Sequence, residues 1–177
     1  MFEPWTTGNI PGQRVATLIA PRAAGKGIKM AKNPLLIVGG LSMTAKAGEK
    51  MLIDYVVEMA KELPVVATAN SLKGFTEKNI TPAAYMGLVE IVDRLKDPEW
   101  GVNGKPHDLV IFAGIHYYLA SQGLSTLKHF APHLKTLTLC NMAHPNANWS
   151  FPNMSTDEWG RALDELLEEI KGGNNGR

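Results

Sequence analysis

The stretch Pro34-Leu-Leu-Ile-Val38-Gly39-Gly40 is a short apolar run that ends in two glycines. Pro64-Val-Val-Ala-Thr68 and Asp108-Leu-Val-Ile-Phe112-Ala-Gly114 have the same form, and Leu134-Lys-Thr-Leu-Thr-Leu-Cys140 alternates more strongly. Runs that are apolar on both faces are typical of parallel strands with helices on either side. These four stretches therefore predict the strands of a buried, mostly parallel sheet.

Helical patterns occupy the intervals between these strands. Apolar residues recur at helical spacing between residues 43 and 62, and Thr81-Pro82 has the form of an N-cap followed by a first-turn proline. Further helices are expected over Arg22–Asn33, from Tyr117 to about Phe130, and after the capping box Ser155–Glu158. Strands that alternate with helices predict the α/β class, as a three-layer α/β/α, Rossmann-like fold with a mostly parallel sheet.

The predicted domain organisation has three parts. Residues 34–171 form a single Rossmann-like domain, residues 1–33 form an N-terminal arm and helix, and residues 172–177 form a flexible tail. Residues 1–50 carry seven Lys or Arg against two acids, whereas residues 151–177 carry six acids against three bases. The asymmetry can guide docking onto a partner, and the aromatic Trp5 favours a docking role for the arm. Taken alone, the charges are better explained by a solvated amphipathic helix at each end. The run Val15–Ala20 fits a strand, the start of a helix or a segment packed on a partner.

Composition excludes several classes of protein. The chain has 177 residues, 45% of them hydrophobic, a formal net charge of +1 and one cysteine, Cys140. One cysteine cannot form an internal disulfide or supply the thiolates of an iron–sulfur cluster or a cysteine-based zinc site. The near-zero charge argues against nucleic-acid binding, and the longest apolar stretch, Leu35–Leu41, is too short for a membrane span. No secretory signal is recognisable, so a cytoplasmic location is expected.

A ligand site is expected at the carboxyl edge of the sheet, where the strand order reverses. Glycines there allow close backbone approach, and backbone N–H groups of Gly39, Gly40 and Gly114 would cradle a pyrophosphate. Tyr117 or Phe75 would contact the rings of a flavin or nucleotide. The candidate cofactor-binding residues are Gly39, Gly40, Ser71, Gly74, Phe75, Gly114, His116 and Tyr117. Against this stands the general preference of strand-to-helix turns for glycine, and no Gly-x-Gly-x-x-Gly follows the first strand.

Three other motifs fail on inspection. The segment Pro21–Gly27 resembles a phosphate loop but lacks its first glycine and its Ser or Thr. Ser42 stands where a hydrolase nucleophile would, yet Thr44 replaces the second glycine, so Ser42 is better interpreted as a helix N-cap. His129 and His133 are separated by Pro132, which prevents the helical alignment that a metal pair needs. No catalytic residue and no metal site are predicted.

Taken in order, a set of motifs resembles one known family. The motifs are Ala23-Ala24 through Lys32-Asn33-Pro34 into Leu35–Gly39, Pro64–Thr68 with Gly74-Phe75, Asp97-Pro98-Glu99-Trp100, and Asp108–Gly114 with Tyr117-Tyr118. Over about residues 14–170 the chain resembles the epsilon subunits of the archaeal acetyl-CoA decarbonylase/synthase complex, which contains a carbon monoxide dehydrogenase.

The resemblance implies a fold, a partner and a role. The fold would be similar to the DHS-like NAD/FAD-binding domain of thiamine-diphosphate enzymes. The partner would be the cluster-bearing carbon monoxide dehydrogenase alpha subunit, in an alpha2-epsilon2 complex. The role would be that of an accessory, non-catalytic subunit that stabilises the alpha chain in acetyl-CoA cleavage and synthesis and assists electron transfer to FAD. Two alternatives stay open: a purely structural subunit whose cleft is empty or filled by side chains, and a stand-alone nucleotide- or flavin-binding enzyme.

Overall fold

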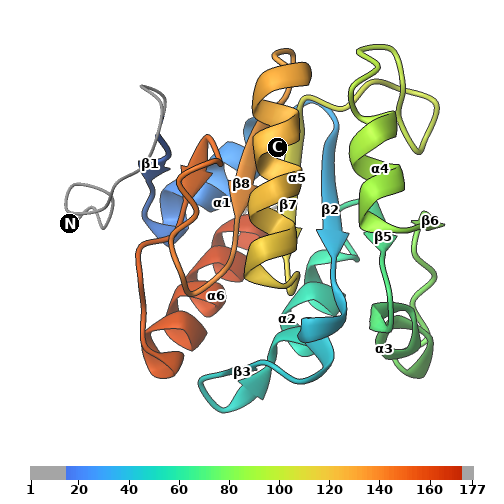
Figure 1. The fold of residues 1–177 in the computed structure, drawn as a ribbon. Helices are drawn as coiled ribbons and strands as arrows, with labels where there is room; N and C mark the ends of the chain where they lie inside the picture. Colours follow the sequence, from blue (N-terminus) through green and yellow to red (C-terminus); the bar gives the residue numbers. More distant parts are fainter. Residues whose placement is uncertain (1–14, 173–177) are drawn as a thin grey trace.

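A parallel sheet forms the centre of the molecule (Figure 1). The computed structural model describes residues 15–172. The strands of the main sheet are β1 (Thr17–Leu18), β2 (Pro34–Val38), β5 (Val65–Ala67), β6 (Ala84–Tyr85), β7 (Leu109–Ala113), β8 (Lys135–Thr138) and β9 (Trp149–Ser150). The helices are α1 (Pro21–Met30), α2 (Leu52–Met59), α3 (Ser71–Glu77), α4 (Leu88–Arg94), α5 (Tyr117–Phe130) and α6 (Thr156–Lys171). A 3-10 helix, η2 (Gly40–Met43), and a two-stranded antiparallel hairpin, β3 (Lys46–Ala47) with β4 (Lys50–Met51), complete the fold.

The seven strands follow the order β1-β9-β8-β7-β2-β5-β6, and every pair is parallel. The first long strand, β2, lies between β5 and β7, with Leu36 opposite both Val65 and Ile111. The chain therefore builds the sheet outward from β2 in two directions. The order reverses between β2 and β7, so the predicted site lies at their carboxyl ends.

Side chains of each central strand alternate between two hydrophobic cores, one on each face of the sheet. Leu36 and Val38 enter the core formed with α1, α2, α3 and α6. Leu35 and Ile37 enter the core formed with α4 and α5. In Figure 1, α5 lies in front of the sheet and α1 and α6 lie behind it. The predicted parallel α/β sheet with helices on both faces is confirmed, because residues that are apolar on both sides of a strand need cover on both sides.

Two predicted helices differ from the observed elements. The expected helix near Thr81 is replaced by β6, whose Ala84 pairs with Val66, and α4 begins only at Leu88. The expected helix over residues 43–62 is α2 alone, preceded by the β3–β4 hairpin. In both places pairing with a neighbouring strand outweighs local helical spacing, which is a weak preference by itself.

The first described residues are part of the sheet and of its helical cover. β1 pairs with β9 at the edge of the sheet, so the open question about Val15–Ala20 is resolved in favour of a strand. The inner residues of α1, Ala24 and Ile28, are buried in the core that also contains α6. Residues 1–14 of the predicted arm, with Trp5, and residues 173–177 of the predicted tail lie outside the described residues.

Candidate functional site

The backbone at the carboxyl ends of β2 and β7 is in direct contact. The Gly39 N–H donates to Ala113 O at 2.8 Å, and the Leu41 N–H donates to Gly114 O at 2.9 Å. A Cβ at Gly39 would lie 2.3 Å from Gly114 O, a distance that real Cβ atoms do not show. Glycine is therefore required at position 39 by the approach of this protein's own backbone, without any ligand.

The 3-10 helix η2 follows Gly39 directly and packs against Gly114 at this contact. Gly114 has a φ of +64°, and a Cβ there would lie 2.7 Å from the Ser42 nitrogen. Ser42 is fully buried, and its Oγ–H donates to Gly39 O at 2.8 Å. The predicted N-cap role of Ser42 is wrong, because Ser42 lies inside η2 and bonds backward. The crevice in which parallel α/β proteins bind ligands is thus closed by a turn of this chain.

The predicted residues of α3 face the core. Ser71 is fully buried; its Oγ lies 2.8 Å from Val38 O and 2.7 Å from Thr68 O and accepts the Thr68 N–H at 3.0 Å. Phe75 is also fully buried. A Cβ at Gly74 would lie 2.4 Å from Met43 Sδ, so this glycine allows α3 to pack on η2. These three residues fasten the loop after β5 to the sheet, and the Phe75 ring does not reach the surface.

The predicted residues at the start of α5 lie at the surface. His116 is exposed, and its ring centroid is 5.9 Å from that of Tyr118. The Tyr117 ring stacks on His144 with centroids 4.2 Å apart, and its hydroxyl donates to Ala143 O at 3.1 Å. Burial of part of this ring raises the pKa of the Tyr117 hydroxyl. Gly40 has more space than Gly39, since a Cβ there would stay 3.6 Å from Ala69 Cβ.

His144 also lies at this edge of the sheet, although it is not among the predicted cofactor-binding residues. It is 1% exposed, and its Nδ1 has no hydrogen-bond partner. Burial lowers the pKa of His144 to about 4, so the imidazole is neutral at physiological pH. Together with Cys140 and Gly114 it lines a cavity of about 10 Å³, roughly the room of one water molecule. Cys140 is half-buried rather than a fully buried core residue, and burial raises the pKa of its thiol.

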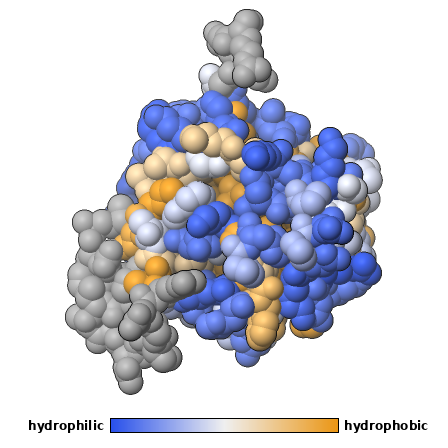
Figure 2. Space-filling view, turned by 90° about the horizontal axis from the view of Figure 1, so that it is seen from above, coloured by the Kyte–Doolittle hydropathy of each residue, from blue (hydrophilic) through white to orange (hydrophobic). Residues whose placement is uncertain are grey.

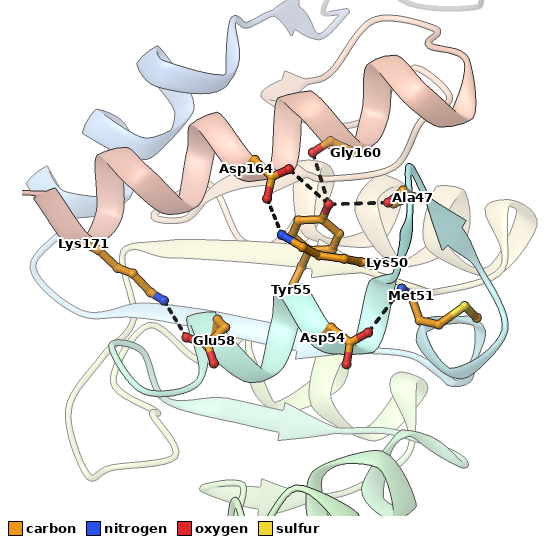
Figure 3. A network of polar contacts seen from close by, with 9 residues as sticks. All are labelled: Ala47, Lys50, Met51, Asp54, Tyr55, Glu58, Gly160, Asp164 and Lys171. Atoms are coloured by element: carbon orange, nitrogen blue, oxygen red, sulfur yellow. Dashed lines mark hydrogen bonds and ion pairs between the residues drawn. The ribbon is translucent and has the colours of Figure 1, made fainter.

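A second polar cluster joins the β3–β4 hairpin, α2 and α6 (Figure 3). The Tyr55 hydroxyl lies 3.3 Å from Gly160 O, and Lys50 Nζ bonds Asp164 Oδ1 at 2.7 Å. Glu58, also in α2, forms ion pairs with Lys171 and Lys61, and these lower its pKa to about 2. Every polar group that Figure 3 draws has a partner within the chain, so the cluster ties elements together rather than awaiting a ligand.

The arrangement differs from the predicted pyrophosphate cradle at Gly39. The Gly39 N–H is already bonded to Ala113 O, and the cavity beside Gly114 is far smaller than a dinucleotide. Within residues 15–172 no group of three His, Cys, Asp or Glu side chains is placed to hold a metal ion. No helix in that same range is long and apolar enough to cross a bilayer. Fold and site therefore define a parallel α/β protein whose own backbone closes its ligand crevice.

Comparison with known proteins identifies the family. The model of the family "CO dehydrogenase beta subunit/acetyl-CoA synthase epsilon subunit" matches residues 2–167. The acetyl-CoA decarbonylase/synthase complex subunit epsilon of Methanothermobacter thermautotrophicus is 46% identical over 170 residues, covering 94% of this chain and 95% of that protein. The corresponding subunit of Methanothrix soehngenii is 34% identical, covering 95% and 91%. Epsilon subunit 1 of Archaeoglobus fulgidus is 34% identical, covering 92% and 89%.

The chain belongs to the family of epsilon subunits of the acetyl-CoA decarbonylase/synthase complex. This confirms the family resemblance that the sequence motifs indicated.

Proposed function

We propose that this chain is the docking subunit of a carbon monoxide dehydrogenase component: it binds the alpha chain and stabilises it, and the alpha chain carries out the chemistry. The observation that carries the proposal is the closed crevice between β2 and β7, where Gly39 and Leu41 bond backbone oxygens across the gap. The single cysteine agrees with it, because a cluster held by four thiolates needs another chain.

The strand order supports a finer assignment of the fold. From β6 through β2 to β9 the order is β6-β5-β2-β7-β8-β9, which is that of a Rossmann dinucleotide-binding domain, with β1 added at the edge. We infer a Rossmann-like domain, similar to the DHS-like domain of thiamine-diphosphate enzymes, in which η2 occupies the crevice. Fold alone does not carry a function, so the filled crevice outweighs the topology.

Co-expression with the alpha chain tests the docking function. The two chains are expected to co-elute in size-exclusion chromatography as an alpha2-epsilon2 assembly. The melting temperature of the alpha chain should rise in the assembly, because a partner that binds only the folded state stabilises it. Elution of the two chains as separate species at micromolar concentration would contradict the proposal. Turnover by the isolated chain would instead support a stand-alone enzyme.

A flavin titration tests the second candidate, electron transfer to FAD, which the strand order favours. We expect FAD fluorescence to stay unchanged when the isolated chain is added, because a pyrophosphate at the predicted place requires η2 to move. Saturable quenching that Tyr117→Ser abolishes and Phe130→Ser preserves would show that η2 opens and that the carboxyl edge binds flavin. Phe130 is a suitable control because it is 66% exposed at the far end of α5 from Tyr117.

A further inference from the structure

An apolar groove lies at the opposite, amino edge of the sheet. It has a volume of about 430 Å³ and runs between α1 and the first residues of β7 and β8. Leu109 and the half-buried Trp149 line its sheet side, and Ile19 lines its end. Figure 2 views this edge and shows apolar surface between hydrophilic groups. The groove is distinct from the crevice between β2 and β7, which lies at the carboxyl edge.

One face of α1 is only partly covered by the described residues. The inner face carries Ala24 and Ile28 in the core shared with α6, and Arg22 and Lys29 form ion pairs with α6. The outer face consists of Ala23, Lys26, Gly27 and Met30, at the i, i+3, i+4, i+7 spacing of one helical stripe, and all four residues line the groove. The Met30 side chain is 83% exposed. A Cβ at Gly27 would lie 3.4 Å from the Trp149 ring, so the exposed Ala23 is the small residue of this stripe that leaves room for a close approach.

The charged side chains that line the groove are Lys26, Lys135 and Asp108, which leave it one net positive charge. Lys26 and Lys135 line it, and neither forms an ion pair with any residue in the range 15–172. The Asp108 carboxylate accepts the backbone N–H groups of Lys32 and Asn33, both at 2.8 Å, so its oxygens have partners within the chain while its negative charge remains. The groove therefore offers an apolar floor flanked by two unpaired ammonium groups. A complementary ligand carries a bulky apolar group beside a carboxylate.

We propose that this groove is the surface on which the chain docks, and that its occupant is a segment of the alpha subunit with a large apolar side chain next to Asp or Glu. The inference rests on the proposed docking function. A peptide segment fits better than a small molecule, because the groove is open to solvent and lacks the converging buried polar groups that orient enclosed ligands. Apolar anchors in grooves carry most of the energy of such interfaces, while flanking charges speed and direct the encounter.

Matched substitutions test the surface in the full-length complex. Met30→Glu and the double variant Lys26→Glu/Lys135→Glu are each expected to weaken binding to the alpha subunit at least about tenfold. The controls are Val89→Glu, at an apolar residue 73% exposed on α4, and Lys46→Glu, in the hairpin at the carboxyl edge. Unchanged melting temperatures of the isolated variants confirm that the fold is intact. Wild-type affinity in both groove variants would contradict the assignment of the groove as the docking surface but not the docking function. Absence of binding by the wild type would contradict the docking function itself.

Oxidation of methionine by hydrogen peroxide locates the interface without a substitution. In the isolated chain Met30 should oxidise rapidly, and complex formation should slow this at least about tenfold, because a group buried in an interface core loses contact with solvent. Met142, 47% exposed beyond β8, should keep its rate. Protection of Met142 in place of Met30 would overturn the proposal. Slow oxidation of Met30 in the isolated chain would mean that the groove is already occupied, which would overturn the proposal. If removal of residues 1–14 restores fast oxidation, those residues occupy the groove; if dilution restores it, a second copy of the chain does.

Discussion

At the scale of single residues, glycines explain why the loops after β2 and β7 meet at the carboxyl edge. Gly39 and Gly114 let two loops meet backbone to backbone, with a hydrogen bond from Leu41 N–H to Gly114 O. Glycines of this kind were predicted to admit a phosphate. The pattern in the sequence is the same in both cases, because glycine permits close approach whatever the approaching group is.

His144 should make stability depend on pH. Its pKa is about 4 in the folded protein and about 6.5 in the unfolded chain, so the unfolded state binds more protons between these values. Stability is therefore fully present above pH 6.5 and falls as the pH drops toward 4, by about 2 kcal/mol between pH 7 and pH 5. Urea unfolding of the wild type at several pH values measures this slope.

The variant His144→Gln isolates the contribution of this side chain. It removes the His144 imidazole, so its stability should change less than that of the wild type over the same pH interval. The change that remains includes the contribution of His107, whose pKa is also lowered by burial. His133→Gln is the control, since it removes an exposed histidine by the same substitution. An equal dependence of the free energy of unfolding on pH in the wild type and both variants would show that His144 is accessible to protons in the folded state.

At the scale of elements, α6 is held against the β3–β4 hairpin by close packing and by the cluster of Figure 3. A Cβ at Gly160 would lie 2.7 Å from the Gly48 nitrogen, and Gly48 itself has a φ of +61°. The Tyr55 hydroxyl lies 3.4 Å from Ala47 O in the hairpin and 3.3 Å from Gly160 O in α6. The ion pair of Lys50 with Asp164 is about half exposed and adds little.

The variant Gly160→Ala should destabilise the protein, although replacing glycine by alanine inside a helix is ordinarily favourable by about 0.5–1 kcal/mol. The added methyl group collides with backbone that cannot move aside, and overpacking of this kind costs about 1–3 kcal/mol. Gly27→Ala in α1 is the matched control, because its Cβ would lie 3.4 Å from the Trp149 ring. Denaturant unfolding should show opposite signs for the two variants, and a gain in stability for Gly160→Ala would refute the packing argument.

At the scale of the whole molecule, residues from both ends of the chain lie side by side. α1 packs on α6, with Gly25 so near Glu169 that a Cβ would lie 2.7 Å from the glutamate Cβ. β1 also depends on β9, through the Thr17 and Leu18 pairs with Trp149 and Ser150. The core on this face therefore needs segments that are far apart in the sequence.

Deletion of residues 1–30 should abolish cooperative unfolding, because it exposes the buried face of α6, including Leu166 and Ile170. Circular dichroism during heating would show a broad or absent transition and the protein would aggregate. Deletion of residues 1–14 is the control and should keep a single sharp transition. A sharp transition for the longer deletion would support residues 34–171 as an independent domain, as the sequence analysis predicted.

Much of this protein could be predicted from its sequence alone. Apolar runs determine the strands β2, β5, β7 and β8, the capping box at Ser155 determines the start of α6, and ordered motifs indicate the family. These features are local, so they can be recognised without knowing which segments meet. Tertiary structure decided the rest: the pairing that makes β6 a strand, the position of η2 over the crevice, the burial of Phe75 and His144, and the exposed stripe of α1. Each of these depends on contacts between distant segments, and a pattern of residue types along the chain does not specify which surface another segment covers.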